Sequence, residues 1–163
     1  MLVKNAIKTV LLLFILFVPS ALFAQQSNPF KVVLDAGHGG KDPGTMRGSI
    51  REKDIVLDVV LRLGKLLEQH NSVKVFYTRK TDVFIELRER ANIANKAKAN
   101  LFVSVHCDSH TSNAYGAGTF VLGTHRNQTN FEGAKKENSA IFYEENHEKN
   151  YDGFDPNSPK SVL

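Results

Sequence analysis

Hydrophobic residues occur along the chain in two alternating patterns. Three short runs are continuously apolar or alternate with polar residues, as in strands that are buried on one or both faces. The segments between these runs place apolar residues three or four positions apart, which is the spacing of one buried helical face. The predicted elements in chain order are strand 31–36, helix 52–69, strand 73–78, helix 81–97 and strand 101–106.

This order predicts an α/β fold, with a twisted, mainly parallel sheet flanked by helices in a single domain. A strand that returns to the same sheet through a helix makes a right-handed crossover, and repeated crossovers build parallel sheets. In the second helix we expect Leu87, Ala91 and Ala94 to face inward and Arg90 to lie near the solvated side. A short fourth strand is expected at 118–122.

The chain changes character after residue 122. Residues 131–163 are rich in Asn, Glu and Lys, and one short helix is expected around 134–146. We interpret 131–163 as an insertion or lid segment. A solvated loop that contacts nothing is an equally good interpretation, because polar insertions usually lie on the surface.

The first 24 residues form a separate unit, in which Lys4 and Lys8 precede an uncharged stretch that ends near Ala24. This is the layout of a secretory signal peptide rather than of a membrane-spanning helix. Residues 25–30 are expected to be a linker. We expect export to the periplasm or the extracellular space, with no stable membrane anchor after cleavage; an uncleaved anchor is the alternative.

Composition agrees with one globular domain and argues against a nucleic-acid partner. Of the 163 residues, 42% are hydrophobic and 23% are charged, as in ordinary globular proteins. Removing the first 24 residues takes away two lysines, so the formal net charge falls from +4 to +2. The sequence has no basic run with interleaved aromatic residues. The single cysteine, Cys107, is expected to be a small buried residue rather than a reactive thiol.

Two of the apolar runs end on a histidine. The first run stops at a Gly-His-Gly-Gly sequence that contains His38, and the run over 101–105 is followed by His106. Parallel strands end at one edge of a sheet, where open α/β folds place ligands, and neighbouring strands lie about 5 Å apart. If these two strands are neighbours, both imidazoles can bind one metal ion. Each histidine alone would more often be a surface or hydrogen-bonded residue.

A hydrolytic zinc site commonly adds a carboxylate to its histidines and leaves one position open for water. Glu52 is the best candidate, because it begins the first predicted helix, whose N-terminus favours an ionised carboxylate. A capping box, in which Ser49 caps the helix and Glu52 folds back to it, is an equally good interpretation. Asp35 is expected either to fix the tautomer of the His38 imidazole or to tie down the turn. The other histidines are interpreted as exposed or loop residues: His70, His110, His125 and His147.

Several short motifs follow one another in order between residues 31 and 122. They are Leu-Asp-Ala-Gly-His-Gly-Gly at 34–40, Asp-Pro-Gly at 42–44, Arg-Glu-Lys-Asp at 51–54, Thr-Arg at 78–79, Arg-Ala-Asn at 90–92 and Ser-Val-His-Cys-Asp at 104–108. This ordered set strongly resembles the zinc-dependent N-acetylmuramoyl-L-alanine amidases, the type 3 amidase family of cell-wall hydrolases. Carried over residue by residue, the resemblance implies that His38, Glu52 and His106 are the zinc ligands.

The resemblance implies zinc-dependent hydrolysis of the amide between N-acetylmuramic acid and the L-alanine of the stem peptide, in cell-wall remodelling or daughter-cell separation. It implies peptidoglycan as the substrate and a protein activator as a candidate partner. The main alternative is a non-catalytic zinc- or peptidoglycan-binding module. A zinc carboxypeptidase or deacetylase is less well supported, because its motifs do not fit as an ordered set.

The family carries a catalytic glutamate on an apolar segment near the end of its domain, and no residue of this sequence matches it. The resemblance therefore implies an incomplete domain, with the general base beyond Leu163, the last strand and helix missing, and reduced activity for this chain. We also expect residues 131–150 to cover the zinc site, as a regulatory helix does in some members of the family. One of four glutamates would then take the open position of the metal: Glu137, Glu144, Glu145 or Glu148.

Overall fold

Three parallel strands form the centre of the fold. In the computed structural model, β1 (Phe30–Ala36) lies between β4 (Val73–Tyr77) and β5 (Leu101–Val105). The predicted α/β fold with a mainly parallel sheet is confirmed, and Phe30 already belongs to β1 rather than to a linker. The structure describes residues 28–108, 115–119, 133 and 135–152.

Several sequence predictions fall wholly or partly outside these residues, among them parts of the linker at 25–30 and of the segment 131–163. The predicted signal peptide, residues 1–24, lies outside them. The fourth strand expected at 118–122 lies mostly outside them as well, and its two described residues, 118 and 119, are not in a strand.

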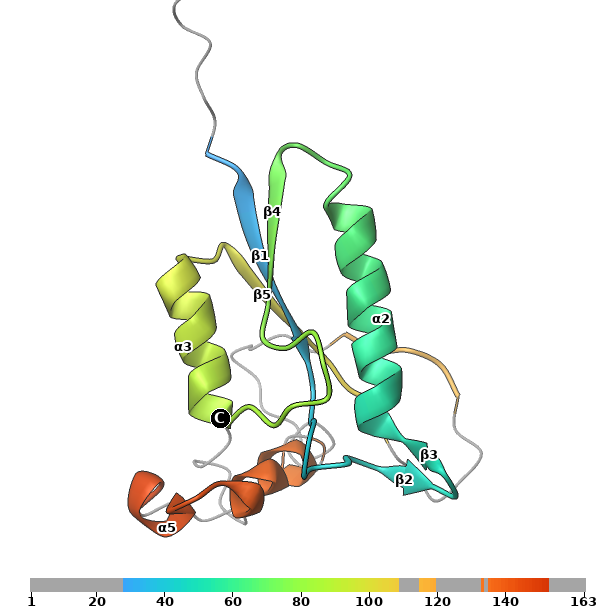
Figure 1. Ribbon diagram of the computed structural model, residues 1–163, viewed down its shortest axis with the longest axis vertical. Coiled ribbons are helices and arrows are strands. Elements are labelled where there is room, and N and C mark those ends of the chain that lie inside the picture. Colours follow the sequence, from blue (N-terminus) through green and yellow to red (C-terminus); the bar gives the residue numbers. More distant parts are fainter. Residues whose placement is uncertain (1–27, 109–114, 120–132, 134, 153–163) are drawn as a thin grey trace, which may run out of the picture.

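Two helices cover opposite faces of the sheet. Helix α2 (Glu52–Leu67) joins β1 to β4, and α3 (Leu87–Ala97) joins β4 to β5. The chain leaves β1 toward one edge of the sheet and later crosses to the other edge, so right-handed crossovers place the two helices on opposite faces. Figure 1 shows α2 and α3 flanking the strands. The carboxyl end of β1 thus lies where the winding reverses, which is the usual ligand position in open α/β sheets.

The contact between α2 and β1 forms the core. Val56 and Val60 are fully buried against alternate residues of β1, namely Val32, Leu34 and Ala36. Burying one such side chain stabilises a fold by about 1.5–3 kcal/mol. The buried face of α2 is narrower than the hydrophobic pattern predicts. Three of the apolar positions on this helix stay exposed: Ile55, Val59 and Leu66.

Helix α3 begins later than predicted, at Leu87 instead of residue 81. Asp82 does not cap a helix, because its carboxylate accepts hydrogen bonds from the Gly40 amide and from Nζ of Lys53, both at 2.7 Å. These bonds hold the segment before α3 against the glycine-rich loop that follows β1. Tertiary contacts therefore override the local helix signal.

The inward face of α3 also differs from the prediction. Arg90 is buried, at 5% exposed, whereas Ala91 is exposed. Arginine is rarely buried unless it is paired, so the pattern places it toward solvent. Here Nη1 of Arg90 lies 2.7 Å from Oδ1 of Asp35, a residue of β1.

The remaining elements lie near the carboxyl edge of the sheet. The hairpin of β2 (Met46–Arg47) and β3 (Ile50–Arg51) precedes α2, and the tail contains the 3₁₀ helix η2 (Ser139–Tyr143) and α5 (His147–Asn150). In Figure 1 the orange and red tail crosses the end of the molecule where β1 and β5 finish. Within the described part of the chain, no helix is long and apolar enough to cross a membrane.

The tail packs on the N-terminus of α3. Glu144, which is buried, accepts a hydrogen bond of 2.7 Å from the amide of Leu87. Amides in the first turn of a helix lack partners within the helix, so this carboxylate satisfies one of them. The Arg88 guanidinium lies 4.6 Å from the centre of the Tyr151 ring, and Ile141 is also buried. Residues 135–152 are therefore in contact with the rest of the fold.

Candidate metal centre

His38 and His106 meet because β1 and β5 are neighbours in the sheet. Ala36 pairs with Val105, and the amide of Gly37 donates to the Val105 carbonyl at 3.1 Å. The two histidines therefore follow their strands at the same edge. Nε2 of His38 lies 3.2 Å from Nδ1 of His106. The predicted juxtaposition of the two strands is confirmed.

Two glycines leave the space that this approach needs. A Cβ at Gly37 would overlap the ring of His106. At Gly44, where φ is +66°, a Cβ would lie 2.6 Å from Cδ2 of His38 and 2.8 Å from Cβ of Glu52. The glycine-rich character of the loop is thus required by close packing around the imidazoles.

Glu52 joins the histidines from the first turn of α2. It is 2% exposed, and its Oε1 lies 3.1 Å from Nε2 of His38 and 3.3 Å from Nδ1 of His106. The amides of Cys107 and Thr45 donate to its two oxygens at 2.7 and 2.9 Å. These bonds fix the carboxylate in one orientation.

The capping-box interpretation of Glu52 is wrong. Helix α2 begins at Glu52 itself, with Arg51 at the N-cap and, among the described residues, no side chain that caps it. A capping box with Ser49 would place Glu52 three residues beyond the cap, inside the helix. The Glu52 carboxylate instead faces the two imidazoles.

A second carboxylate reaches the same place from the tail. Oε2 of Glu137 lies 2.7 Å from Nδ1 of His106 and 3.1 Å from Nε2 of His38. The ligand atoms of these three residues and of Glu52 all lie within 4.8 Å of one another. We call these four residues the metal cluster.

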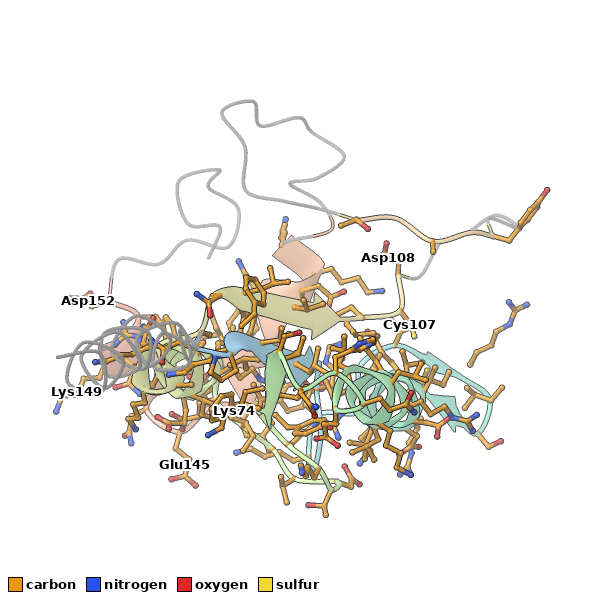
Figure 2. The ribbon with its side chains drawn as sticks, turned by 90° about the horizontal axis from the view of Figure 1, so that it is seen from above. Lys74, Cys107, Asp108, Glu145, Lys149 and Asp152 are labelled. Carbon is orange, nitrogen blue, oxygen red and sulfur yellow. The ribbon has the colours of Figure 1, made fainter. Side chains whose placement is uncertain are left out.

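The other tail glutamates have different surroundings. Glu144 is bonded to α3, and Glu145 and Glu148 are exposed. Figure 2 shows Glu145, with Lys149 and Asp152, at the opposite margin of the molecule from Cys107, the neighbour of His106. All four tail glutamates were candidates from the sequence, and no feature of the sequence distinguishes Glu137 from the others.

The spacing of the ligand atoms suits a tetrahedral cation. Atoms about 2.0–2.1 Å from a tetrahedral zinc ion lie about 3.3 Å apart. Five of the six separations within the metal cluster range from 2.7 to 3.3 Å, and the sixth, between the two carboxylates, is at most 4.8 Å. Two imidazoles and two carboxylates are also ligand types that divalent metals accept. The residues of the cluster therefore fit a bound divalent cation.

Asp42, rather than Asp35, orients the first imidazole. Oδ2 of Asp42 lies 2.8 Å from Nδ1 of His38. This contact favours the tautomer that carries its proton on Nδ1, so that the lone pair of Nε2 faces the cluster. The interpretation of Asp35 as the partner of the His38 imidazole is wrong, because its carboxylate lies on the α3 side of the sheet and bonds to Arg90 and Thr78. The spacing of four residues between His38 and Asp42, across a glycine turn, is the signal that could have indicated this pair.

The carboxylates raise the proton affinity of both imidazoles. Burial opposes a charge on His38, but hydrogen bonds with Asp42, Glu137 and Glu52 outweigh burial and raise its pKa to about 11. Burial is also outweighed at His106, where Glu137 and Glu52 raise the pKa to about 9. In turn, the two histidines outweigh burial and lower the pKa of Glu137 to about 2. The cluster thus has a high affinity for positive charge.

The remaining histidines lie elsewhere. His70 is exposed, and Nδ1 of His147 lies 3.3 Å from the carbonyl oxygen of Glu144. His110 and His125 fall outside the described residues. Cys107 is partly buried, and burial raises the pKa of its thiol, which agrees with a packed residue.

Three residues of the metal cluster, His38, Glu52 and Glu137, line a pocket between the tail and the loop that leads into the β2–β3 hairpin. Thr45 lines the pocket on the hairpin side, and Lys136 and Tyr143 line it on the tail side. Nζ of Lys136 donates to Oγ1 of Thr45 at 2.7 Å. This bond joins the tail to the residue that precedes β2, across the pocket.

Comparison with known proteins points to one family. The family profile described as N-acetylmuramoyl-L-alanine amidase matches residues 32–157. The N-acetylmuramoyl-L-alanine amidase AmiC of Escherichia coli O6:H1 is 43% identical over 103 residues, which cover 62% of this chain and 25% of that protein. An endolysin of Bacillus phage SPP1 is 54% identical over 78 residues, which cover 48% of this chain and 29% of the endolysin.

Solved structures of proteins from the same family resemble this chain as well. The catalytic domain of CwlV, an amidase from Bacillus (Paenibacillus) polymyxa var. colistinus, aligns with a TM-score of 0.50 at 40% identity, over 52% of this chain and 49% of that domain. An amidase from Clostridium difficile 630 aligns with a TM-score of 0.52 at 33% identity, over 56% of this chain and 50% of its own. The chain thus matches 25–29% of the length of these curated relatives and about half of the solved ones.

Proposed function

Because the chain belongs to the N-acetylmuramoyl-L-alanine amidase family, we propose that it hydrolyses the amide bond between N-acetylmuramic acid and L-alanine in peptidoglycan. The proposed centre is a zinc ion held by His38, Glu52 and His106. The observation that carries this proposal is the convergence of these three residues at the carboxyl edge of the sheet, with spacings that suit one cation.

Zinc bound there would polarise the scissile carbonyl and lower the pKa of a bound water to about 7. The chain's own residues hold the ligands in place. Asp42 orients His38, and the amides of Thr45 and Cys107 fix the Glu52 carboxylate. Such fixed partners of the ligands raise metal affinity and select the tautomer.

The tail would control access to this centre. Catalytic zinc sites keep one position open for water, whereas structural sites are closed by four protein ligands. The Glu137 carboxylate lies where that fourth ligand would be. Turnover therefore requires the Glu137 carboxylate to leave the cluster, and the bonds from Lys136 to Thr45 and from Leu87 to Glu144 hold the tail against such a shift.

The test is metal-dependent release of new L-alanine amino ends from purified muropeptides. We expect release with zinc, loss of release with a chelator, and loss of both zinc and release in His38→Ala and His106→Ala. His70→Ala is the matched control, because His70 is exposed and lies outside the metal cluster. Retention of one zinc ion per chain by both cluster variants after dialysis would refute the centre.

The position of Glu137 also favours a second candidate, a non-catalytic zinc- and peptidoglycan-binding module with a closed site. The variant Glu137→Ala separates the two functions. An amidase should release amino ends faster in this variant, because the fourth position opens. A module should bind zinc and muropeptide and release nothing, with or without Glu137.

Export to the compartment that holds peptidoglycan belongs to the same proposal. It is supported by the predicted signal peptide at 1–24 and by the cell-wall substrate that the relatives' names imply. A protein activator that moves the tail is the further partner we propose. Cell fractionation, with deletion of 1–24 as the control, tests the location.

A further inference from the structure

Two arginines outside the metal cluster bind the loop that carries His38. Arg79 follows β4 and is 3% exposed, and Arg90 belongs to α3 and is 5% exposed. Between them they donate hydrogen bonds to three successive carbonyl groups, those of residues 36, 37 and 38. The end of β1 is therefore held by side chains from two other elements.

Arg90 uses its whole guanidinium group. Nη2 donates to the carbonyl of His38 at 2.8 Å, and Nη1 donates to the carbonyl of Ala36 at 2.8 Å and to Asp35 at 2.7 Å. Nε donates to the carbonyl of Ile85 at 2.9 Å. A lysine carries its charge on one atom and cannot reproduce this planar fork.

Arg79 connects the end of β1 to the start of α2. Its Nη2 donates to the carbonyl of Gly37 at 2.8 Å and to the carbonyl of Lys53 at 2.9 Å. Lys53 directly follows Glu52 in the first turn of the helix. One nitrogen atom thus sets the distance between the two segments that carry the first two members of the metal cluster.

The conformation of His38 requires such support. Its φ is 58°, in the left-handed region that residues other than glycine rarely adopt. The direction of the side chain follows from φ and ψ, and the bond from Arg90 fixes the peptide group after His38. Held in this way, the ring faces Glu52 and His106.

The arrangement is costly for a purely structural role. Burying charges opposes folding unless they are well paired. Among the described residues, the buried carboxylate that pairs with these two arginines is Asp35, and it bonds to Arg90. Burial and the Arg90 charge lower the pKa of Arg79. In proteins generally, carbonyl groups at strand ends can be satisfied by neutral amides or by water, without a buried charge.

We propose that Arg79 and Arg90 are positioning residues for the metal centre, which fix the direction of His38 and its spacing from Glu52. The inference rests on the proposed metal centre. Neither arginine is a ligand, and both act through the backbone of residues 36–38 and 53.

The test uses Arg90→Lys and Arg79→Lys in the full chain, which keep the charge and lose the fork. Zinc affinity is measured by competition with a chromogenic chelator, and the Co²⁺ form by its visible absorption spectrum. We expect zinc affinity to fall by about 10–100-fold, as for other residues that orient ligands, with an altered Co²⁺ spectrum and an unchanged far-UV circular dichroism spectrum.

Thr78→Val is the matched control. Oγ1 of Thr78 donates to Asp35 at 2.6 Å, in the same buried network but not to the loop carbonyls. This variant should lower Tm by a few degrees and keep the zinc affinity and Co²⁺ spectrum of the wild type.

Each other outcome overturns the inference. Wild-type zinc affinity in both folded lysine variants, or an equal loss in Thr78→Val, would make the arginines structural. Unfolding of both lysine variants would do the same. These results leave the metal centre standing, whereas a wild-type chain that binds no zinc would overturn the proposed function and this inference together.

Discussion

A buried polar cluster around Asp35 and the partly exposed metal cluster meet at the end of β1, and their charges are balanced differently. On the α3 side, the Asp35 carboxylate accepts hydrogen bonds from Arg90, Thr78 and Ser104 at 2.6–2.7 Å. On the other side, the metal cluster brings two carboxylates against two imidazoles, which are neutral unless they take up protons. The first cluster is complete within the chain, and the second draws its positive charge from solution.

The difference separates structure from function. The Asp35 cluster joins donors to an acceptor, whereas the carboxylates of the metal cluster hydrogen-bond to its imidazoles only through protons that a metal ion can replace. Strongly shifted pKa values belong to both clusters, so a shift by itself does not identify the site. What distinguishes the metal cluster is the excess of ligand atoms that point at one another.

The largest effect should come from breaking the Asp35 cluster. Asp35→Ala leaves the buried charge of Arg90 unpaired and should lower the free energy of unfolding by about 3–5 kcal/mol. Ser104→Ala, which removes one hydrogen bond to the same carboxylate, should cost about 1 kcal/mol. Urea unfolding in the presence of a chelator measures both. Equal losses in the two variants would contradict the assignment of Asp35 as the centre of this network.

Zinc should have the next largest effect, and it should act on the metal cluster. At a free concentration one hundred times Kd, a ligand specific to the folded state stabilises it by about 2.7 kcal/mol. We expect this gain in the wild type and in Ser104→Ala, and its loss in His106→Ala. Thermal unfolding with and without zinc provides the measurement. A gain that survives in His106→Ala would place the metal elsewhere.

A smaller effect should distinguish the two tasks of Glu52. Glu52→Gln keeps an oxygen that accepts a hydrogen bond from the amide of Cys107 or Thr45, and loses the negative charge. Its unfolding free energy without metal should stay nearer to that of the wild type than that of Glu52→Ala. Its zinc affinity should fall at least tenfold, which is about 1.4 kcal/mol. Unchanged zinc titrations in Glu52→Gln would show that the carboxylate is not a ligand.

The two clusters should also differ in how their contributions to stability depend on pH. The raised pKa values of His38 and His106, about 11 and about 9, give stability that is complete below about pH 6.5 and is lost as pH rises toward these values. The pKa of Asp35, which Arg90 lowers against the effect of burial, gives stability that is complete above about pH 3.8 and is lost as pH falls.

Measurements of Tm against pH, with a chelator and with excess zinc, test this difference between the two clusters. We expect Tm with the chelator to fall from pH 6.5 to 9, and excess zinc to flatten this decline, because metal replaces protons on the imidazoles. The decline of Tm at acid pH, which reflects Asp35, should be the same with the chelator and with excess zinc. A decline above pH 6.5 that excess zinc leaves unchanged would be the contrary result.

The parts of the site that follow from strand and helix ends were predictable from the sequence. An apolar run followed by a histidine locates His38 and His106, because parallel strands finish at one edge. The first residue of an amphipathic helix locates Glu52. These are local signals, and the structure brings the three residues together.

The parts that depend on packing between distant segments were not predictable. Arg90 lies on a helix whose pattern points it to solvent, and its partners, Asp35 and the backbone of residues 36–38, are more than fifty residues away. Helix α3 begins later than predicted because Asp82 bonds to the glycine-rich loop after β1. Glu137 resembles the other tail glutamates in sequence, and only tertiary contacts distinguish it.

The pairing of β1 with β5 also determines when the metal cluster can form. Val32 pairs with Leu101 across α2, β4 and α3, so this contact closes a long loop, and contacts of this kind form late in folding. His38 and Glu52 lie close together in the chain, whereas His106 arrives with β5. We therefore expect metal uptake to be a late event in refolding, so that the visible absorption of bound Co²⁺ should report when the sheet is complete.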